Sequence, residues 1–321
     1  MTTHSYVEYG GLASVPGPFR CSDATIYALA LKADKDALQT LCGEVLTDRD
    51  RDRDRELGYS PLGEFVILTF GTMDVASMCT DHSTLFGTTY ADMGTSREQH
   101  VAFWVPTAAG HRKDHTTVIE RFAMFVPAMW VDNPVSLVGG REIYGLAKQW
   151  GQFDIEPGDE PSCELQVFGG AFGQRQTSGY RRLLEVTPGD KVGTGKIVEE
   201  VVIEAGRTVW HGLERLLKGD VAVPDAELVA EAASALHHRQ LHQVAARQFR
   251  EARANGVDAT PVELVELVST FGQVGIKVLN RKFEFTLDAV PSHPIGKVLG
   301  VQSQTVDGAV EVTSSFDLAH L

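Results

Sequence analysis

The chain has 321 residues, of which 43% are apolar and 22% are charged, and its formal net charge is −14 at pH 7. These proportions are those of a folded globular protein, so they exclude wholesale disorder, and the length allows one large domain or two small ones. Because an acidic chain repels phosphate, we expect neither a nucleic acid nor an anionic membrane surface as its partner.

Targeting signals and cysteine spacing point to a cytoplasmic protein. The longest nearly unbroken apolar run, Phe122 to Val131, is about half as long as a bilayer span requires. The N-terminus lacks a basic stretch followed by an apolar core, so no secretory signal is predicted. The four cysteines are far apart and have no C-x-x-C spacing, so we expect reduced thiols.

The N-terminal part contains one predicted helix. Residues 1–25 are rich in Gly and Pro and are expected to lie extended across the surface. The segment from Asp34 to Leu46 is predicted to be helical because its apolar residues recur at helical spacing. The run DRDRDRDRE at residues 48–56 has nearly cancelling charges and is predicted to be a solvated loop, with a docking patch as the alternative.

From Glu64 onward the sequence is dominated by strand-like segments that are rich in Val, Phe, Thr and Ile and are bounded by turn residues. Their close spacing favours an antiparallel meander or barrel over a doubly wound parallel sheet. The predicted strands are Phe65–Met73, His100–Thr107, Arg121–Val131, Cys163–Phe172, Tyr180–Val186, Lys196–Glu204, Lys282–Ala289, Lys297–Val306 and Val310–Asp317.

Two helices are predicted to interrupt these strands. Apolar residues at helical spacing predict a helix from Asp225 to Asn255, which would end at the Asn-Gly pair. A capping box that begins at Thr260 predicts a second helix, which would end at Gly272. We interpret the pair as a helical insertion at about 223–273 within a single domain that spans residues 1–321.

Two short patterns carry weak chemical signals. His238 and His242 have a spacing that can hold a metal ion, but no third ligand is evident, so we predict no metal site. The glycines between Gly189 and Lys196 do not have the spacing of a phosphate-binding loop, and this segment is predicted to be a turn.

The segment from Met129 to Gly151, MWVDNPVSLVGGREIYGLAKQWG, has the most informative pattern in the chain. A strand of large apolar residues leads into a Gly-rich turn, and a single lysine, Lys148, follows. From the residue pattern alone, a surface lysine whose stem lies over Trp150 is the simpler interpretation.

This segment resembles the central signature of the acetoacetate decarboxylase superfamily, in which Asp-Asn at the end of a strand is followed by Gly-Arg-Glu and then by a lysine that forms a Schiff base. Gly140-Arg141-Glu142 and Lys148 match that signature in identity and spacing. Ser96-Arg-Glu98 is similar to the hairpin that carries an active-site glutamate of the family. The resemblance implies an α+β fold with a mainly antiparallel, cone-shaped β-barrel and surrounding helices, in a homo-oligomer.

The resemblance also implies roles for individual residues. Lys148 would be the catalytic nucleophile and Glu98 would move protons, while Arg141, Glu142, Tyr144 and Gln149 are candidate substrate-binding residues. An amine must be neutral to attack a ketone, and burial in an apolar pocket favours the neutral form. The resulting iminium withdraws electrons by itself, so we predict neither an organic cofactor nor a metal.

The first hypothesis is therefore a Schiff-base-forming carbon–carbon lyase that acts on a small keto acid. Gln149 stands where the decarboxylase proper has a second lysine, which argues against classical acetoacetate decarboxylation. The alternatives are an aldolase–dehydratase that acts on pyruvate-like substrates and a non-catalytic barrel that binds a hydrophobic ligand. Both enzyme hypotheses require Lys148 to lie in a dry recess.

Overall fold

The computed structural model describes residues 14–46, 58–83, 87–113, 116–170, 177–191, 240–250 and 258–321. This part of the chain contains eleven strands, three α-helices and one 3₁₀ turn, η2. In chain order they are β1 (Phe19–Lys32), α1 (Lys35–Val45), β2 (Gly58–Pro61), β3 (Phe65–Ser77), η2 (Tyr90–Met93), β4 (Thr95–Lys113), β5 (Thr116–Val131), α2 (Pro134–Glu142), β6 (Lys148–Glu156), β7 (Ser162–Gly169), β8 (Gly179–Lys191), β9 (Gln240–Arg247), β10 (Glu263–Leu287), α5 (Ile295–Leu299) and β11 (Gln304–His320).

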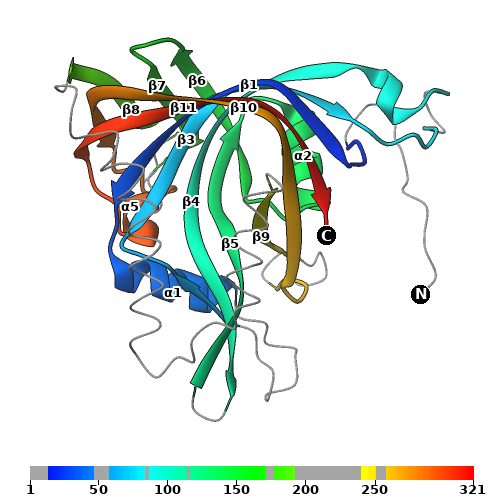
Figure 1. The fold of residues 1–321 in the computed structure, drawn as a ribbon, viewed down its shortest axis with the longest axis horizontal. Coiled ribbons are helices and arrows are strands. Elements are labelled where there is room, and N and C mark those ends of the chain that lie inside the picture. The colour runs from blue at the N-terminus through cyan, green and yellow to red at the C-terminus, as the bar shows by residue number, and fades with distance from the viewer. Residues whose placement is uncertain are drawn as a thin grey trace.

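The strands form one strongly curved sheet whose hydrogen-bonded order closes into a ring (Figure 1). The order β2-β4-β3-β1-β11-β10-β8-β7-β6-β5-β9 is closed by a further pairing between β4 and β5. The sheet is mainly antiparallel, as predicted, but β5 pairs in parallel with both β6 and β9. The parallel β5–β6 pair requires a crossover connection, and α2 lies in that connection.

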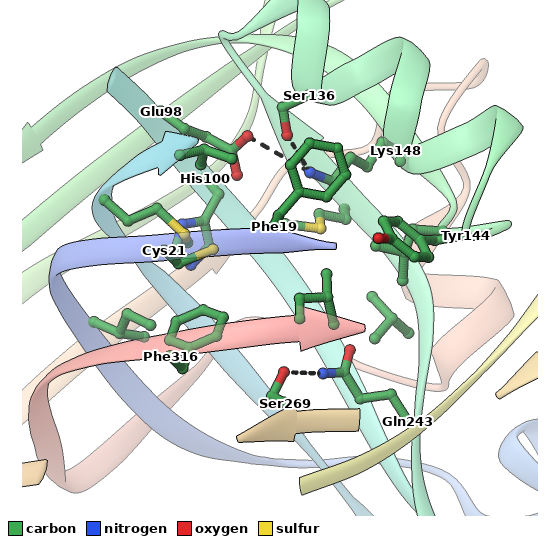
Figure 2. A pocket seen from close by; sticks show the side chains of 18 of the residues that line it. Phe19, Cys21, Glu98, His100, Ser136, Tyr144, Lys148, Gln243, Ser269 and Phe316 are labelled. Carbon is green, nitrogen blue, oxygen red and sulfur yellow. Dashed lines mark hydrogen bonds and ion pairs between the residues drawn. The ribbon is translucent and has the colours of Figure 1, made fainter. Parts of the chain in front are cut away.

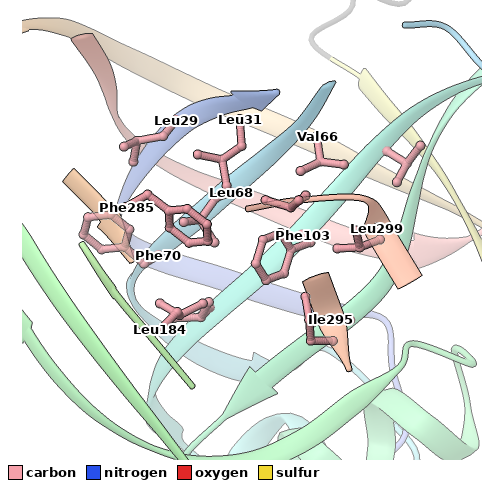
Figure 3. Packing of buried hydrophobic residues seen from close by; sticks show 14 of the residues in the cluster. Leu29, Leu31, Val66, Leu68, Phe70, Phe103, Leu184, Phe285, Ile295 and Leu299 are labelled. Atoms are coloured by element: carbon pink, nitrogen blue, oxygen red, sulfur yellow. The ribbon is translucent and has the colours of Figure 1, made fainter. Parts of the chain in front are cut away.

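One face of these strands carries the packed core. Side chains alternate along a strand, so every second residue of β1, β3 and β4 points to the same side. Leu29, Leu68 and Phe103 are each at most 1% exposed and belong to one cluster, which Figure 3 shows together with Ile295 and Leu299 of α5. The buried side chains of α1 belong to the same cluster.

The other face of the same strands lines a cavity. Ile26 of β1, Thr69 of β3 and His100 of β4 alternate with the core residues and border this space. On β5 the alternation changes phase at Pro127, where the pairing with β4 shifts by one residue. A bulge tolerates proline because the extra residue needs no ladder hydrogen bond, and the phase change keeps Met129 on the cavity face.

The predicted N-terminal helix is confirmed as α1. The side chain of Asp34 caps it by accepting a hydrogen bond of 2.8 Å from the backbone N–H of Ala37. The strand predictions that overlap β3, β4, β5, β7, β8, β10 and β11 are also confirmed, although the observed strands are generally longer. The first strand, β1, was missed because residues 1–25 were interpreted as a surface segment.

The strand predicted at Lys297–Val306 is wrong in its first part. Residues Ile295–Leu299 form α5, and β11 begins only at Gln304. The helix ends at Gly300, whose φ of +65° lies in the left-handed region that glycine adopts without strain.

The predicted helical insertion is wrong wherever the structure describes it. Gln240–Arg247 is strand β9, and the segment predicted as the second helix is the first half of β10. The capping-box residue Glu263 accepts hydrogen bonds from Arg247 of β9 and does not cap a helix. Strand β9 buries three consecutive residues, Gln243 to Ala245, so its apolar run fits a helical period as well as a strand. Strand β10 buries every second residue, and its pairing with β9 outweighs the local capping signal.

Several predictions fall outside the described residues. These are the loop at 48–56, the strand at Lys196–Glu204, the first part of the long helix, and His238. His242 lies on β9. None of the helices in the described ranges combines the length and apolar character that crossing a bilayer requires.

Candidate active site

The cavity has a volume of about 470 Å³ and is lined by residues of strands β1, β3, β4, β5, β6, β9, β10 and β11 and of helix α2. Its wall is mostly apolar, with phenylalanine and methionine side chains prominent. Polar groups gather at two places, one around Lys148 and the other at Gln243 and Ser269 (Figure 2). A largely apolar recess with a few convergent polar groups is the usual form of a small-molecule site.

Lys148 reaches this cavity from the first residue of β6 and is only 7% exposed. Its Nζ atom donates a hydrogen bond of 2.5 Å to Oγ of Ser136 and lies 3.5 Å from Oε2 of Glu98. Ser136 belongs to the first turn of α2 and Glu98 to β4, so three separate elements meet at the amine. The predicted recess around Lys148 is therefore present.

Asp132 and Asn133, the Asp-Asn pair of the signature, fix the position of α2 relative to β4. Asn133 caps α2 by accepting a hydrogen bond from the backbone N–H of Ser136, and its Nδ2 donates to Oγ of Ser96 at 2.7 Å. Asp132 accepts a hydrogen bond of 2.7 Å from the backbone N–H of Gln99. The two side chains thus bind the start of α2 to the part of β4 that carries Glu98.

Gly140 allows the lysine to lie against α2. A Cβ atom at this position would come within 2.5 Å of Cδ of Lys148, so a larger residue would displace the side chain. The neighbouring Arg141 donates a hydrogen bond of 3.0 Å from Nη1 to the backbone oxygen of Lys148. The Gly-rich turn predicted here is in fact the second half of α2, and it packs on the lysine.

Glu98 and His100 lie two residues apart on β4 and therefore share its cavity face. Glu98 is 1% exposed and His100 is 2% exposed. Oε2 of Glu98 and Nδ1 of His100 have no hydrogen-bond partner among the described residues. Since buried polar atoms usually have partners, both atoms are open to a group that enters from the cavity.

Burial keeps three other ionisable side chains of the cavity uncharged near neutral pH. Loss of hydration lowers the pKa of His100 to about 4, with a smaller opposing effect of Glu98. Burial raises the pKa of the Cys21 thiol to about 12, and Glu98 adds to this shift. The pKa of Tyr144 is likewise raised to about 12, mainly by burial. Glu98 and Lys148, whose side chains lie 3.5 Å apart, are the other ionisable groups near the centre of this site.

Of the four predicted substrate-binding residues, only Tyr144 is among the described residues that line the cavity. Tyr144 is buried, lines the cavity and packs edge-on against Phe19, with ring centroids 5.7 Å apart. Arg141 and Glu142 are exposed, and neither is among the described residues that border the cavity. Gln149 points to the opposite side of β6, where its Oε1 lies 3.1 Å from Nε2 of His293. A direct substrate contact of these three residues stays a prediction.

Lys148 is the only lysine or arginine among the described residues that border the cavity. Arg20 of β1 pairs with Asp317 on the exposed surface. The described lining therefore includes one lysine or arginine side chain, and its Nζ atom lies 3.5 Å from the carboxylate of Glu98.

His100, Ser136, Gln243 and Ser269 are among the polar residues of the cavity that were not identified from the sequence. The Asn133-Pro134 pair is a helix-start signal that would have placed Ser136 in a first turn. The two-residue spacing from Glu98 would have placed His100 beside it. Gln243 and Ser269 could not be found, because both were assigned to helices.

Metal-binding side chains are not clustered in the described ranges. No group of three or more His, Cys, Asp or Glu residues in that part of the chain has an arrangement that could hold an ion.

No protein-family model and no curated protein sequence matches the chain. Among solved structures, the acetoacetate decarboxylase from Legionella pneumophila subsp. pneumophila str. Philadelphia 1 is similar, with a TM-score of 0.55 and 14% identity, over 100% of this chain and 90% of that one. An acetoacetate decarboxylase-like enzyme from Sphingomonas wittichii RW1 gives a TM-score of 0.50 and 12% identity, over 96% of this chain and 94% of that one. At these identities the likeness concerns the fold. The chain therefore shares its fold with acetoacetate decarboxylase and with an acetoacetate decarboxylase-like enzyme, as the resemblance around Lys148 led us to expect.

Proposed function

We propose that the protein is a carbon–carbon lyase that acts on a keto acid through an imine at Lys148. The observation that carries this proposal is the position of the lysine. Its amine is buried at the edge of an apolar cavity, is oriented by Ser136 and lies 3.5 Å from a carboxylate. Lysine nucleophiles are activated in such desolvated surroundings.

The reaction starts when the neutral amine attacks the carbonyl carbon of the substrate. A carbon–nitrogen bond forms, and the carbonyl oxygen leaves as water after it has taken up protons. Glu98 lies close enough to Nζ to accept a proton from the amine and to return it to the departing oxygen. The product of this step is an iminium ion that carries the positive charge inside the cavity.

The iminium then accepts the electron pair of the bond that breaks. In a β-keto acid that bond joins the carboxylate to the α-carbon, so CO₂ leaves and an enamine remains. Protonation of the enamine carbon and addition of water release a ketone and restore the lysine. Glu98, whose Oε2 has no hydrogen-bond partner among the described residues, is the proposed proton carrier in this step as well.

Other residues have supporting roles in this proposal. The guanidinium of Arg141 donates a hydrogen bond to the backbone carbonyl oxygen of Lys148 and so fixes that residue's backbone. Gly140 has no side chain and leaves room for the side chain of Lys148. The phenol of Tyr144, whose pKa burial raises to about 12, is protonated at neutral pH, and its hydroxyl can donate a hydrogen bond to the substrate.

Reductive trapping tests the proposal. The protein is incubated with candidate keto acids and borohydride, and the reduced adduct is located by peptide mass mapping. We expect the adduct on Lys148, and we expect none in Lys148→Met. Lys297→Met, which removes an exposed lysine of α5, is the matched control and should leave trapping unchanged. Absence of an adduct with every keto acid tried would reject an imine mechanism.

The size and apolar wall of the cavity favour a second candidate, a protein that binds a hydrophobic ligand without converting it. This candidate predicts tight binding of apolar ligands and no adduct with any carbonyl compound. If trapping succeeds but no CO₂ is released, the aldolase–dehydratase alternative is favoured, because its enamine adds to an aldehyde and no CO₂ leaves.

A further inference from the structure

The cavity is larger than a small keto acid needs. Its volume of about 470 Å³ falls in the range of about 300–1,000 Å³ that is typical of pockets for drug-sized ligands. At about 30 Å³ per molecule, this space corresponds to roughly 16 waters of bulk liquid. A wall that is mostly apolar cannot hold that much water well, so an apolar body is the better occupant.

The two polar places of the cavity lie far apart along β5. Lys148 is paired with Met129 of this strand, and Gln243 is paired with Met124. Five residues of regular strand would span about 16 Å of backbone, and the bulge at Pro127 shortens this distance. Figure 2 shows Lys148 and Glu98 near the top of the view and the Gln243–Ser269 pair near the bottom.

The wall between these ends is apolar and adaptable. Four of the six methionines in the chain border the cavity, together with the phenylalanines of β1, β10 and β11. Methionine is unbranched and polarisable, so it fits ligands of irregular shape. The pair Phe271 and Phe316, whose tilted rings have centroids 5.2 Å apart, adds further apolar surface.

The distal end offers hydrogen bonds but no charge. Gln243 is 5% exposed and Ser269 is 2% exposed, and Nε2 of Gln243 donates to Oγ of Ser269 at 2.7 Å. The serine hydroxyl accepts this bond and therefore keeps its own proton to donate, while the glutamine amide keeps an oxygen to accept. Both side chains border the cavity, so these functions are directed toward a ligand.

We propose that the substrate is a keto acid with a long apolar substituent that ends in an uncharged hydrogen-bonding group. The keto group would meet Lys148, the substituent would lie along the methionines and phenylalanines, and the terminal group would bind Gln243 and Ser269. An anionic terminal group is disfavoured, because the only cation of the described lining is at the opposite end. This inference rests on the proposed function for the reaction, but its binding part stands on the cavity alone.

A series of ketones tests the binding part without any chemistry at the lysine. The probes are acetone, methyl ketones with butyl, heptyl and nonyl chains, and the nonyl ketone with a terminal hydroxyl. Such methyl ketones are what β-keto acids leave after losing CO₂. The binding protein is the double variant Lys148→Met/Glu98→Gln, which cannot form an imine and leaves no unpaired buried charge. Affinity is measured by calorimetry.

We expect the dissociation constant to fall about threefold to fourfold per added methylene until the cavity is filled. Ser269→Ala and Gln243→Leu, each introduced into the same background, should weaken the hydroxyl-terminated ketone about fivefold and leave the plain nonyl ketone nearly unchanged. Ser303→Ala, which removes a serine that bonds Leu287 outside the cavity, is the matched control. Affinities that do not depend on chain length, or equal effects on the two nonyl ketones, would overturn the inference.

Trapping with borohydride in the unaltered protein separates this inference from the proposed function. If long ketones bind the double variant tightly but leave no adduct on Lys148 of the unaltered protein, the imine mechanism fails and the ligand class stands. If acetone is trapped as efficiently as the nonyl ketone, and the dissociation constants do not change with chain length, the imine mechanism is supported. The proposal of a long apolar substituent is then rejected.

Discussion

The two faces of strand β4 show how one segment serves both stability and chemistry. Val101 and Phe103 point into the packed core and are completely buried by apolar neighbours. Glu98 and His100 are nearly as buried, but they face the cavity and include polar atoms that have no hydrogen-bond partner among the described residues. The core face is fully packed, whereas the cavity face keeps open space and unmet polar groups, which is the condition for binding a ligand.

The largest expected effect concerns packing on the core face. Phe103→Ala should lower the free energy of unfolding by about 3–5 kcal/mol, because it removes a fully buried ring and leaves a void. Met73→Ala on the cavity face of β3 should cost only about 1 kcal/mol, because the methionine already borders open space and has fewer contacts to lose. Urea unfolding of both variants measures the difference. Equal losses would mean that the cavity is closed in solution.

The second effect concerns the pH dependence of stability, and it comes from His100. In the folded protein the pKa of this imidazole is about 4, below its ordinary value of 6.5. As the pH falls below about 6.5, the unfolded chain takes up a proton that the folded chain refuses, so stability is lost until the pH reaches about 4. The loss should amount to about 3 kcal/mol.

His100→Gln isolates this contribution. The variant should lack the His100 part of the acid destabilisation, so its unfolding free energy should change less than that of the unaltered protein between pH 7 and about pH 4. Urea unfolding at a series of pH values provides the measurement. Identical pH dependence in the two proteins would show that the imidazole is hydrated and not buried.

The two ends of the cavity differ in how well the sequence predicts them. The signature from Asp132 to Lys148 identified the lysine, and the structure shows why its residues are needed: Asn133 and Asp132 fix α2 to β4, and Gly140 admits the lysine stem. These contacts are local in sequence or involve one neighbouring strand, so a short motif can record them.

The distal part of the cavity could not be predicted in the same way. Gln243 and Ser269 meet only because β9 pairs with β10, and this pairing overrides the helical signals of both segments. The capping box at Thr260 and the long apolar spacing are real local patterns, but long-range hydrogen bonding decides the outcome. The closing pairs of the ring are similarly invisible to local periodicity.

The third prediction concerns the acid–base pair. Glu98→Gln should lower turnover of a keto acid about 10²-fold, because the proposed proton carrier is lost while the shape of the side chain is kept. Borohydride should still trap an adduct on Lys148, because the amine and Ser136 are unchanged, but more slowly, because Glu98 also moves protons while the imine forms. Turnover and trapping are measured on the same preparation. A variant that keeps full turnover would remove Glu98 from the mechanism.

The smallest of the four effects concerns Ser136, a positioning residue that acts through the lysine. Ser136→Ala removes the acceptor of the Nζ hydrogen bond, so the amine should sample other orientations and react about tenfold more slowly. The helix itself should persist, because Asn133 supplies its cap through the backbone N–H of residue 136, which alanine retains. The rate of adduct formation at saturating ketone measures the orientation effect, and calorimetry on the same variant checks that ligand affinity is unchanged. Ser136→Thr keeps the hydroxyl and should recover most of the rate. If threonine fails to recover it while affinity is preserved, the serine hydroxyl does not orient the amine, and the cavity face holds Lys148 by packing alone.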